Sequence, residues 1–574
     1  MNYTANIHTP ERHFLPKDFI ITDWKNLESY FKDLLQREIS SEEDLEKWLE
    51  DASELEAVIS EDANWRQIRM TCDTENKELE QAFTFFVMEI QPHIQSYADK
   101  LNKKLVENPY AKKLDHDTYF TYLRNIKKNI ELFREENIPL NSELSVLAQH
   151  YGVISGKMTI RIDEKEYTLQ QAAKFLENPD RNLREEVYKK INDRRLEDKD
   201  ELNKLFTTLV QKRNQLGLNA GFDNYRDFRF KELGRFDYTK EDCFQFHESV
   251  RQHILPLVNE IYQKKKKKLN IEVLKPWDIE ASPEGIKPLS PFKTGAELLQ
   301  KTLSCLDEID PFFADCLRQM EKMHRLDLES RKGKAPGGYN CPLPESGAPF
   351  IFMNAAGQMA DITTIIHEGG HAVHSFLTHD LRLNGFKEYP MEIAEVASMS
   401  MELFSMDRWE SFFENKDELN RAKEYQLERV ITIFPWIAII DKFQHWVYEN
   451  PSHTEEQRAS AWKGILNEFS SSVIDFTGLD EYRQYSWQRQ LHLYEVPFYY
   501  IEYGIAQLGA IGLWMQFKKD KQTALNNYIK ALRLGGTKTL PALFEAAGLK
   551  FDFSTAYVSE LMSFVHEEMM KLEN

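Results

Sequence analysis

The chain has 574 residues, of which 42% are hydrophobic and 12% aromatic, so large cores are expected and disorder is excluded as the main state. Lys and Arg number 73 against 93 Asp and Glu, and the formal charge of −20 argues against binding to nucleic acid or to an anionic membrane. This length predicts two or three subdomains, which we place at residues 1–150, 151–200 and 201–574.

The cysteines and the apolar runs indicate a cytoplasmic protein without a membrane segment. The five cysteines are scattered and lack the close spacing of zinc knuckles or redox motifs, so we expect reduced thiols. The first residues lack the basic segment and apolar run of a secretory signal. The longest largely apolar run, residues 430–440, contains Pro435 and is too short to span a bilayer.

Helical periodicity dominates the chain. From about residue 24 to 136, apolar side chains recur at three- and four-residue spacing, which predicts several long antiparallel helices. Alternation through Ile160 and Ile162, followed by a polar turn, predicts a short β-hairpin at residues 157–169. Helices are expected to resume over residues 169–216 and again from residue 238.

A second break lies at residues 331–357. Its glycines and prolines predict a loop, and the apolar residues 349–354 that follow predict a strand. From residue 363 to the end the pattern is again helical. The expected fold class is therefore mainly α, with a small β-sheet next to residue 363 and a short hairpin in the N-terminal half.

The segment His367-Glu368-Gly369-Gly370-His371 is the most informative part of the sequence. Side chains four residues apart on a helix project from one face, about 6 Å apart, so His367 and His371 can bind one zinc ion. Glu368 lies beside them, placed to take a proton from water on the metal.

The residues around this segment support a helix with one buried face and one face toward a site. The side opposite His367 is apolar or small, through Ile362, Ile365, Gly369, Ala372, Val373 and Phe376. The alternative, two histidines on an ordinary exposed helix, would not predict one apolar and one polar face.

A catalytic zinc ion needs a third protein ligand and an open coordination position. Glu392, Glu395 and Glu402 lie on one face of a predicted helix over residues 392–402, and their spacing alone does not choose among them. A solvated acidic face is the alternative explanation for these carboxylates. His374 lies a full turn beyond His371, so we expect it to support a ligand or face the substrate rather than to bind the metal.

The sequence resembles the M3 family of oligopeptidases, in particular its oligoendopeptidase F branch, over most of the chain. The resemblance implies a large helical zincin of two lobes around a deep groove that admits unfolded peptides and excludes folded proteins. The resemblance rests first on the hairpin followed by Asn178-Pro179-Asp180-Arg181-Asn182-Leu183-Arg184, and on Gly337-Gly338-Tyr339 before Pro349-Phe350-Ile351-Phe352. It continues through the helix of His367 and through residues 392–402 and 492–504. It ends with Leu534-Gly535-Gly536-Thr537 and Ala547-Gly548.

The resemblance also implies a third ligand. The family has a Glu-x-x-Ser-x-x-x-Glu pattern whose first Glu binds zinc, and Glu395, Ser398 and Glu402 match it here. One Zn²⁺ per chain is then expected on His367, His371 and Glu395. Glu402 is expected to orient a ligand imidazole.

A late cluster of His and Tyr is implied to bind substrate and to stabilise the transition state. His492 and Tyr503 match it as catalytic residues and Tyr500 as a substrate-binding residue. Residues 496–498 depart from the family pattern and offer no counterpart to its first tyrosine. The loop Gly337-Gly338-Tyr339 is expected to bind substrate as well.

These features predict a zinc-dependent endopeptidase that hydrolyses internal bonds of short unfolded peptides, with residues 201–574 as its catalytic domain. Glu368 is expected to activate water, while zinc and Tyr and His side chains stabilise the oxyanion. The strand at residues 350–354 is expected to pair with the substrate backbone. Oligopeptides are the expected partners, and we expect a monomer or a small homo-oligomer.

Two other functions are consistent with the residues alone. A zinc exopeptidase would need a side chain that captures one end of the substrate, and an unrecognised Arg could do this. A helical peptide-binding or scaffold protein could retain the motif without catalysis, although the intact Glu368 argues against it. Cleavage of a peptide blocked at both ends distinguishes an endopeptidase from an exopeptidase. A metal assay distinguishes an enzyme from a non-catalytic binding protein.

Overall fold

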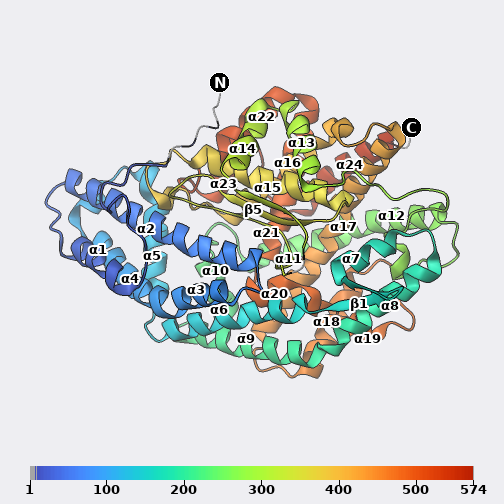
Figure 1. Ribbon diagram of the computed structural model, residues 1–574, viewed down its shortest axis with the longest axis horizontal. Helices are drawn as coiled ribbons and strands as arrows, with labels where there is room; N and C mark the ends of the chain where they lie inside the picture. Colours follow the sequence, from blue (N-terminus) through green and yellow to red (C-terminus); the bar gives the residue numbers. More distant parts are fainter. Residues whose placement is uncertain (1–4, 6, 8, 332, 573–574) are drawn as a thin grey trace.

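The computed structural model describes residues 5, 7, 9–331 and 333–572. It is mainly helical with two small sheets, which confirms the predicted fold class. Figure 1 shows an elongated molecule with the N-terminal helices at its left and lower front, and with α15 (Met359–Thr378) and β5 (Phe350–Ala355) near its centre. No helix among the described residues has the length and hydropathy needed to cross a membrane.

The first five helices form what we call the N-terminal lobe, and all of them except the third contribute side chains to a core within it. Leu27, Phe31 and Trp48 are buried in this core. It also contains Leu383 and Phe386, which belong to the loop between α15 and α16 (Met391–Ser405). The five helices are α1 (Trp24–Gln36), α2 (Glu42–Cys72), α3 (Lys77–Phe85), α4 (Gln91–Glu107) and α5 (His116–Leu132).

A two-stranded hairpin follows α6 (Asn137–Gly156). Its strands, β1 (Thr159–Ile162) and β2 (Lys165–Thr168), pair antiparallel. Asp163 and Glu164 connect them with φ angles of 49° and 63°, the left-handed values that a tight two-residue hairpin turn requires. The predicted hairpin is therefore confirmed.

The segment 178–184, part of the sequence resemblance, has a structural role. Arg184 donates to Oδ1 of Asp278 at 2.8 Å, and Arg181 donates to Oδ2 at 2.8 Å. Asp278 is fully buried, so the two guanidinium groups balance its charge. The helices of this middle region are α7 (Leu169–Ala173), α8 (Arg181–Glu197), α9 (Lys199–Asn219), α10 (Tyr225–Glu232), α11 (Lys240–Ser249), α12 (Leu255–Lys268), α13 (Gly295–Asp307) and α14 (Pro311–Lys322).

A three-stranded sheet precedes α15. Its strands are β3 (Leu326–Glu329), β4 (Tyr339–Cys341) and β5, in the order β3-β5-β4. The central strand β5 pairs parallel with β3 and antiparallel with β4. The strand predicted over residues 349–354 is thus confirmed, and both of its edges are occupied.

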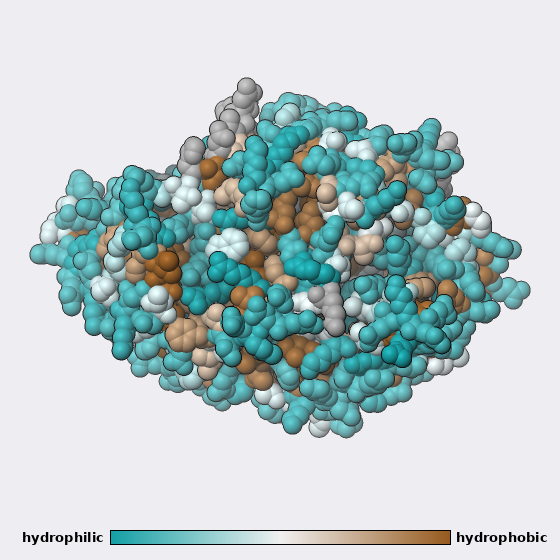
Figure 2. Space-filling view, in the orientation of Figure 1, coloured by the Kyte–Doolittle hydropathy of each residue, from teal (hydrophilic) through white to brown (hydrophobic). Residues whose placement is uncertain are grey.

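Helices make up the rest of the described chain, and α15, α16 and α21 pack together in the main core. Figure 2 shows hydrophilic side chains over most of one face, with hydrophobic ones gathered near its hollowed centre. The remaining helices are α17 (Lys416–Glu449), α18 (Glu455–Phe469), α19 (Asp480–Gln484), α20 (Leu491–Glu495), α21 (Tyr500–Lys519), α22 (Lys521–Leu532), α23 (Leu540–Ala546) and α24 (Thr555–Leu572).

The close approach of α15 and α16 depends on Gly370. A Cβ atom at this residue would lie 2.5 Å from Cα of Ser398 and 2.7 Å from the carbonyl oxygen of Ala397. Both of these atoms belong to the α16 backbone, so a side chain at residue 370 would force the two helices apart. Gly369 differs, because its Cβ would meet a Leu317 methyl group at an ordinary 3.6 Å.

We expect Gly370→Ala to lower the free energy of unfolding by about 1–3 kcal/mol or more, the usual cost of overpacking a core. Gly369→Ala is the matched control, and it is expected to unfold near the wild-type temperature. Thermal unfolding of both variants, followed by circular dichroism, measures the difference. Equal melting temperatures for the two variants would contradict the argument from helix approach.

Candidate active site

A cavity of about 940 Å³ lies between the N-terminal lobe and the helices that follow the sheet. One wall comes from α2, α4 and the residues between α3 and α4. The other wall comes from β4, α15, α16 and the start of α21. The polar side chains that line this second wall include His367, Glu368, His371, Glu395, Tyr499 and Tyr503.

Three possible metal ligands meet in the cavity wall. Oε2 of Glu395 lies 3.2 Å from Nε2 of His367 and 3.7 Å from Nε2 of His371. Ligand atoms of the three residues all lie within 4.8 Å of one another. Two imidazoles and one carboxylate form a donor set that suits zinc, with the cavity on their open side.

The side chain of Glu395 is held in its ionised form. Burial alone would raise its pKa, but the charges of His371 and His367 and hydrogen bonds from His367 and Tyr499 lower it to about 2. The Tyr499 hydroxyl donates to Oε1 of Glu395 at 2.6 Å. Oε2, the atom nearest the histidines, accepts a hydrogen bond from the Ser398 hydroxyl at 3.2 Å and retains a second lone pair for a metal ion.

Glu402 orients one of the imidazoles. Its Oε1 lies 2.7 Å from Nδ1 of His367, and its Oε2 accepts a hydrogen bond from Nε2 of Gln426 at 2.9 Å. This contact keeps Nδ1 of His367 occupied and leaves Nε2 facing the cluster. The arrangement is the one that the sequence resemblance implied for Glu402.

Glu368 lies next to the cluster and has an oxygen without a partner. The residue is 6% exposed, and its Oε2 makes no hydrogen bond to any described residue. Burial, together with the charges of Glu395 and Glu402, raises the pKa of Glu368 to about 7, despite the opposing charge of His367. A carboxyl group with such a pKa can both accept and return a proton near neutrality.

The late His and Tyr residues form an aromatic cluster beside the ligands. Nε2 of His492 lies 3.4 Å from the hydroxyl oxygen of Tyr503, and Nδ1 lies 2.6 Å from Nε2 of Gln490. Burial lowers the pKa of His492 to about 4, so the imidazole is neutral near pH 7. Tyr503 lines the cavity.

Tyr500 does not line the cavity. Its ring lies 5.0 Å from that of His492 and 5.4 Å from that of Tyr503, and only 9% of the residue is exposed. Its predicted role in substrate binding thus has no geometric support. Tyr499 takes the position at the cavity wall, because it lies four residues before Tyr503 and so shares a face with it.

Sequence reasoning missed Tyr499. The family pattern pointed to two tyrosines, and residues 496–498 offered no counterpart to the first one. The spacing of Tyr499 and Tyr503, four residues apart, is the signal that could have found it.

The loop before the sheet contributes to the cavity through two of its three predicted residues. Gly338 and Tyr339 line it, and the Tyr339 ring stacks on Phe352 with centroids 4.7 Å apart. Gly337 lies behind them in a turn with φ of 100°, and its carbonyl oxygen accepts a hydrogen bond from Asn354 at 2.8 Å.

The prediction that the strand at residues 350–354 pairs with substrate is wrong. β5 lies between β3 and β4, so its backbone groups are already paired on both edges. β4 is the edge strand next to the cavity, which Tyr339 and Asn340 line. Asn340 also donates to the carbonyl oxygen of Glu368 at 3.1 Å, which fixes β4 against α15.

His374 and Glu392 lie outside the ligand cluster. His374 is fully buried and does not line the cavity, so it does not face substrate. Its ring stacks on that of Tyr389, which does line the cavity, with centroids 3.6 Å apart. The carboxylate of Glu392 accepts a hydrogen bond from the hydroxyl of Tyr238 at 2.6 Å.

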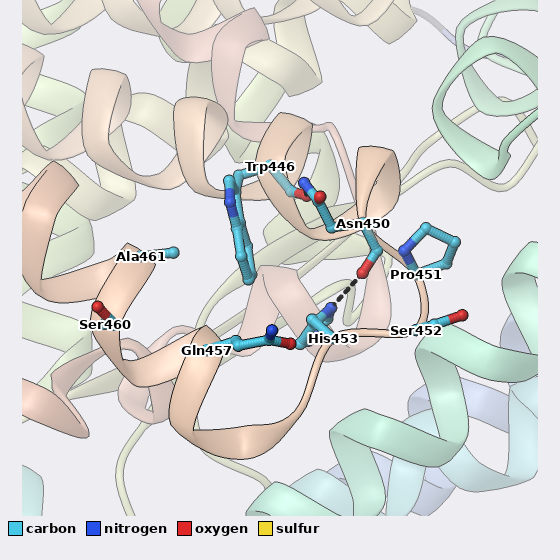
Figure 3. A pocket seen from close by; sticks show the side chains of 8 residues that line it. All are labelled: Trp446, Asn450, Pro451, Ser452, His453, Gln457, Ser460 and Ala461. Atoms are coloured by element: carbon cyan, nitrogen blue, oxygen red, sulfur yellow. Dashed lines mark hydrogen bonds between the residues drawn. The ribbon is translucent and has the colours of Figure 1, made fainter.

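Another hollow, of about 510 Å³, lies between α17 and α18 and contains His453 (Figure 3). Nδ1 of His453 lies 2.6 Å from the carbonyl oxygen of Asn450, and Arg458 donates to Nε2 at 2.9 Å. Both ring nitrogens are therefore occupied. This hollow lacks a carboxylate among its lining residues and offers no comparable chemistry.

Comparisons with known proteins agree with this fold. Residues 174–563 match peptidase family M3, and residues 14–133 match the peptidase M3 N-terminal domain. An oligoendopeptidase F homolog of Borreliella burgdorferi is 25% identical over 524 residues, which cover 86% of this chain and 85% of that protein. The solved structure of PZ peptidase A with an inhibitor has a TM-score of 0.91 at 26% identity, covering 96% of this chain and 99% of the other.

A more distant solved structure, oligoendopeptidase F from Enterococcus faecium, shares the fold. It has a TM-score of 0.65 at 15% identity and covers 96% of this chain and 97% of its own. Fold and family match together define the class of protein as a metalloendopeptidase. Because the match covers well over half of its length, the chain belongs to peptidase family M3.

Tyr499→Phe tests the contact that holds Glu395. The change removes the hydroxyl that donates to Oε1 of Glu395 and keeps the ring. We expect metal affinity to fall about 10-fold, since loss of a hydrogen bond to a metal ligand typically costs 10- to 100-fold. Competition with a chromophoric chelator measures the affinity. Tyr500→Phe is the matched control and should bind metal like the wild type.

Proposed function

We propose that this protein is a zinc-dependent endopeptidase that hydrolyses internal bonds of short, unfolded peptides. The observation that carries the proposal is the convergence of His367, His371 and Glu395 beside the unpaired carboxyl oxygen of Glu368, in the wall of a 940 Å³ cavity. The similarity to an oligoendopeptidase F homolog and to PZ peptidase A supports peptide substrates.

The proposed zinc ligands are His367, His371 and Glu395. When bound there, zinc would polarise the scissile carbonyl group and make water more acidic. Glu402 and Tyr499 fix the directions of His367 and Glu395, so the donor atoms need little rearrangement on binding. Three protein ligands leave the open position that a catalytic site requires.

Glu368 acts as the general base. Its raised pKa and free Oε2 suit it to take a proton from the attacking water and to pass that proton to the leaving amine. Burial keeps bulk water from competing for the carboxylate. The two neighbouring carboxylates, Glu395 and Glu402, each have a hydrogen-bond partner at both oxygens.

Tyr503 stabilises the oxyanion. Its hydroxyl group faces the cavity and can donate to negative charge that develops on the substrate carbonyl oxygen. His492, neutral and 3.4 Å from that hydroxyl, holds it in place and also belongs to the catalytic group. Tyr500 supports the His492 ring from behind.

The free edge of β4 binds the substrate backbone, in place of β5. An extended peptide that adds to this edge forms main-chain hydrogen bonds, which have little dependence on sequence. Gly338 and Tyr339 form part of this contact, while Gly337 shapes the turn. Because the cavity lies between two walls of packed helices, a folded protein cannot reach the edge strand.

The proposal also covers the cellular location and the oligomeric state of the enzyme. Free cysteines at all five positions suit a reducing, cytoplasmic location. Each chain contains a complete proposed ligand set, so catalysis needs no second copy, and a monomer or small homo-oligomer would serve.

A peptide of about ten residues, blocked at both ends, tests endopeptidase against exopeptidase activity. Cleavage at an internal bond, identified by mass spectrometry, is the expected outcome. Glu368→Gln is the matched control, since it keeps the ligands but removes the base, and it should retain metal while losing nearly all turnover. Cleavage only of peptides with a free end would favour an exopeptidase.

Tyr503→Phe tests the oxyanion role. Removal of one such donor typically lowers the rate by 10²- to 10³-fold, and we expect kcat to fall by about that factor with little change in KM. Tyr500→Phe makes the same chemical change three residues away and is expected to change kcat by less than about 10-fold. Steady-state kinetics on one fluorogenic peptide compares the two, and an unchanged kcat for Tyr503→Phe would exclude the role.

A further inference from the structure

A second group of side chains with metal-binding atoms lies where α11 and α17 pack together, and none of its residues lines the catalytic cavity. Cys243 and His247 come from α11, and Asp441 and His445 come from α17. Each pair is spaced four residues apart, so both members project from one helix face toward the other helix. All four residues are at most 3% exposed.

The distances among three of these side chains suit a metal ion, and the fourth, His247, lies beside Asp441. Oδ2 of Asp441 lies 2.9 Å from Nε2 of His247 and 3.3 Å from Nε2 of His445. Ligand atoms of Cys243, Asp441 and His445 all lie within 4.8 Å of one another. Zinc bonds of 2.0–2.3 Å place tetrahedral donor atoms about 3.3–3.7 Å apart, so small side-chain shifts suffice.

Unpaired polar atoms in this group point to a ligand. Neither ring nitrogen of His445 makes a hydrogen bond to a described residue, and the same is true of Oδ1 of Asp441. The 3.3 Å approach of His445 to Asp441 lacks hydrogen-bond alignment. An unpaired polar atom in an apolar interior lowers the stability of the fold. The surroundings of His445 are apolar, since its ring centroid lies 4.9–5.7 Å from those of Phe230, Phe244 and Phe498.

We propose that Cys243, Asp441 and His445 form a second, structural zinc site, in which His247 holds the Asp441 carboxylate in place. Binding forms three bonds between protein atoms and zinc and releases the Cys243 thiol proton to solvent. One thiolate and one carboxylate then balance the two positive charges of the ion, so the buried site is neutral. The mixed S, N and O donor set selects zinc over magnesium or calcium, which prefer oxygen ligands alone.

The site would join α11 to α17 and support the catalytic wall. His445 packs on Phe498, whose carbonyl oxygen accepts a hydrogen bond from Arg235. The next residue, Tyr499, donates to Glu395. The three ligand residues are buried and do not line the catalytic cavity, so substrate cannot reach this ion, which stabilises the fold and takes no part in hydrolysis.

Metal analysis of the full-length protein tests the proposal. The chain is produced with zinc in the growth medium, because its buried ligands must be loaded as the protein folds. We expect two zinc ions per chain in the wild type and one in His367→Ala/His371→Ala. Adding Cys243→Ser to that double variant should leave none. Adding Cys305→Ser, a buried cysteine without nearby imidazoles, is the matched control and should leave one.

A spectroscopic measurement on the unaltered chain covers the case in which Cys243→Ser fails to fold. Growth with cobalt in place of zinc should give a thiolate-to-cobalt charge-transfer band in the near ultraviolet. The catalytic ligands include no sulfur, so this band cannot come from the catalytic site. No metal in His367→Ala/His371→Ala together with no thiolate band in the cobalt protein would overturn the proposal, and both results would leave the catalytic zinc assignment untouched.

Discussion

The contact between α15 and α16 at Gly370 determines where the metal-binding atoms meet. A helix that carries two histidines supplies only two of the proposed ligands, and the third comes from a helix whose backbone must lie in contact with the first. Because residue 370 has no side chain, the carboxylate of Glu395 reaches within 3.2 Å of His367. The neighbouring Gly369 has room for a Cβ atom. Only Gly370, of the two glycines in the motif, is therefore required for the contact between the helices.

The three carboxylates of α16 show how one helix keeps several buried acids apart. Glu392 is bound by the hydroxyl of Tyr238, Glu395 faces the histidines, and Glu402 lies against His367 and Gln426. Each acid therefore has its own donors, and their mutual repulsion is reduced. Glu368, which lacks a donor at Oε2, is the acid whose pKa is raised toward neutrality.

Much of this fold could be predicted from local patterns. The hairpin follows from alternation and a polar turn, and α15 follows from its buried face, because both signals lie within a few residues of one another. The choice of Glu395 over Glu392 required a family pattern, since their partners come from distant segments. β5 was placed as a strand correctly, but nothing local indicates that its two edges are occupied. The contact of Tyr499 with Glu395 and the meeting of side chains from α11 and α17 could not be predicted either, because in each case the partner lies on a helix distant in sequence.

The loop between the two ligand-bearing helices is anchored in the other half of the molecule. Leu383 and Phe386 are buried in the core of the N-terminal lobe, and Asn384 donates its backbone N–H to Ser53 of α2 at 2.6 Å. The N-terminal lobe, which forms one wall of the cavity, therefore holds the loop that connects α15 to α16. A hinge motion that opened the cavity would also pull on this segment, so substrate entry and ligand geometry are mechanically coupled.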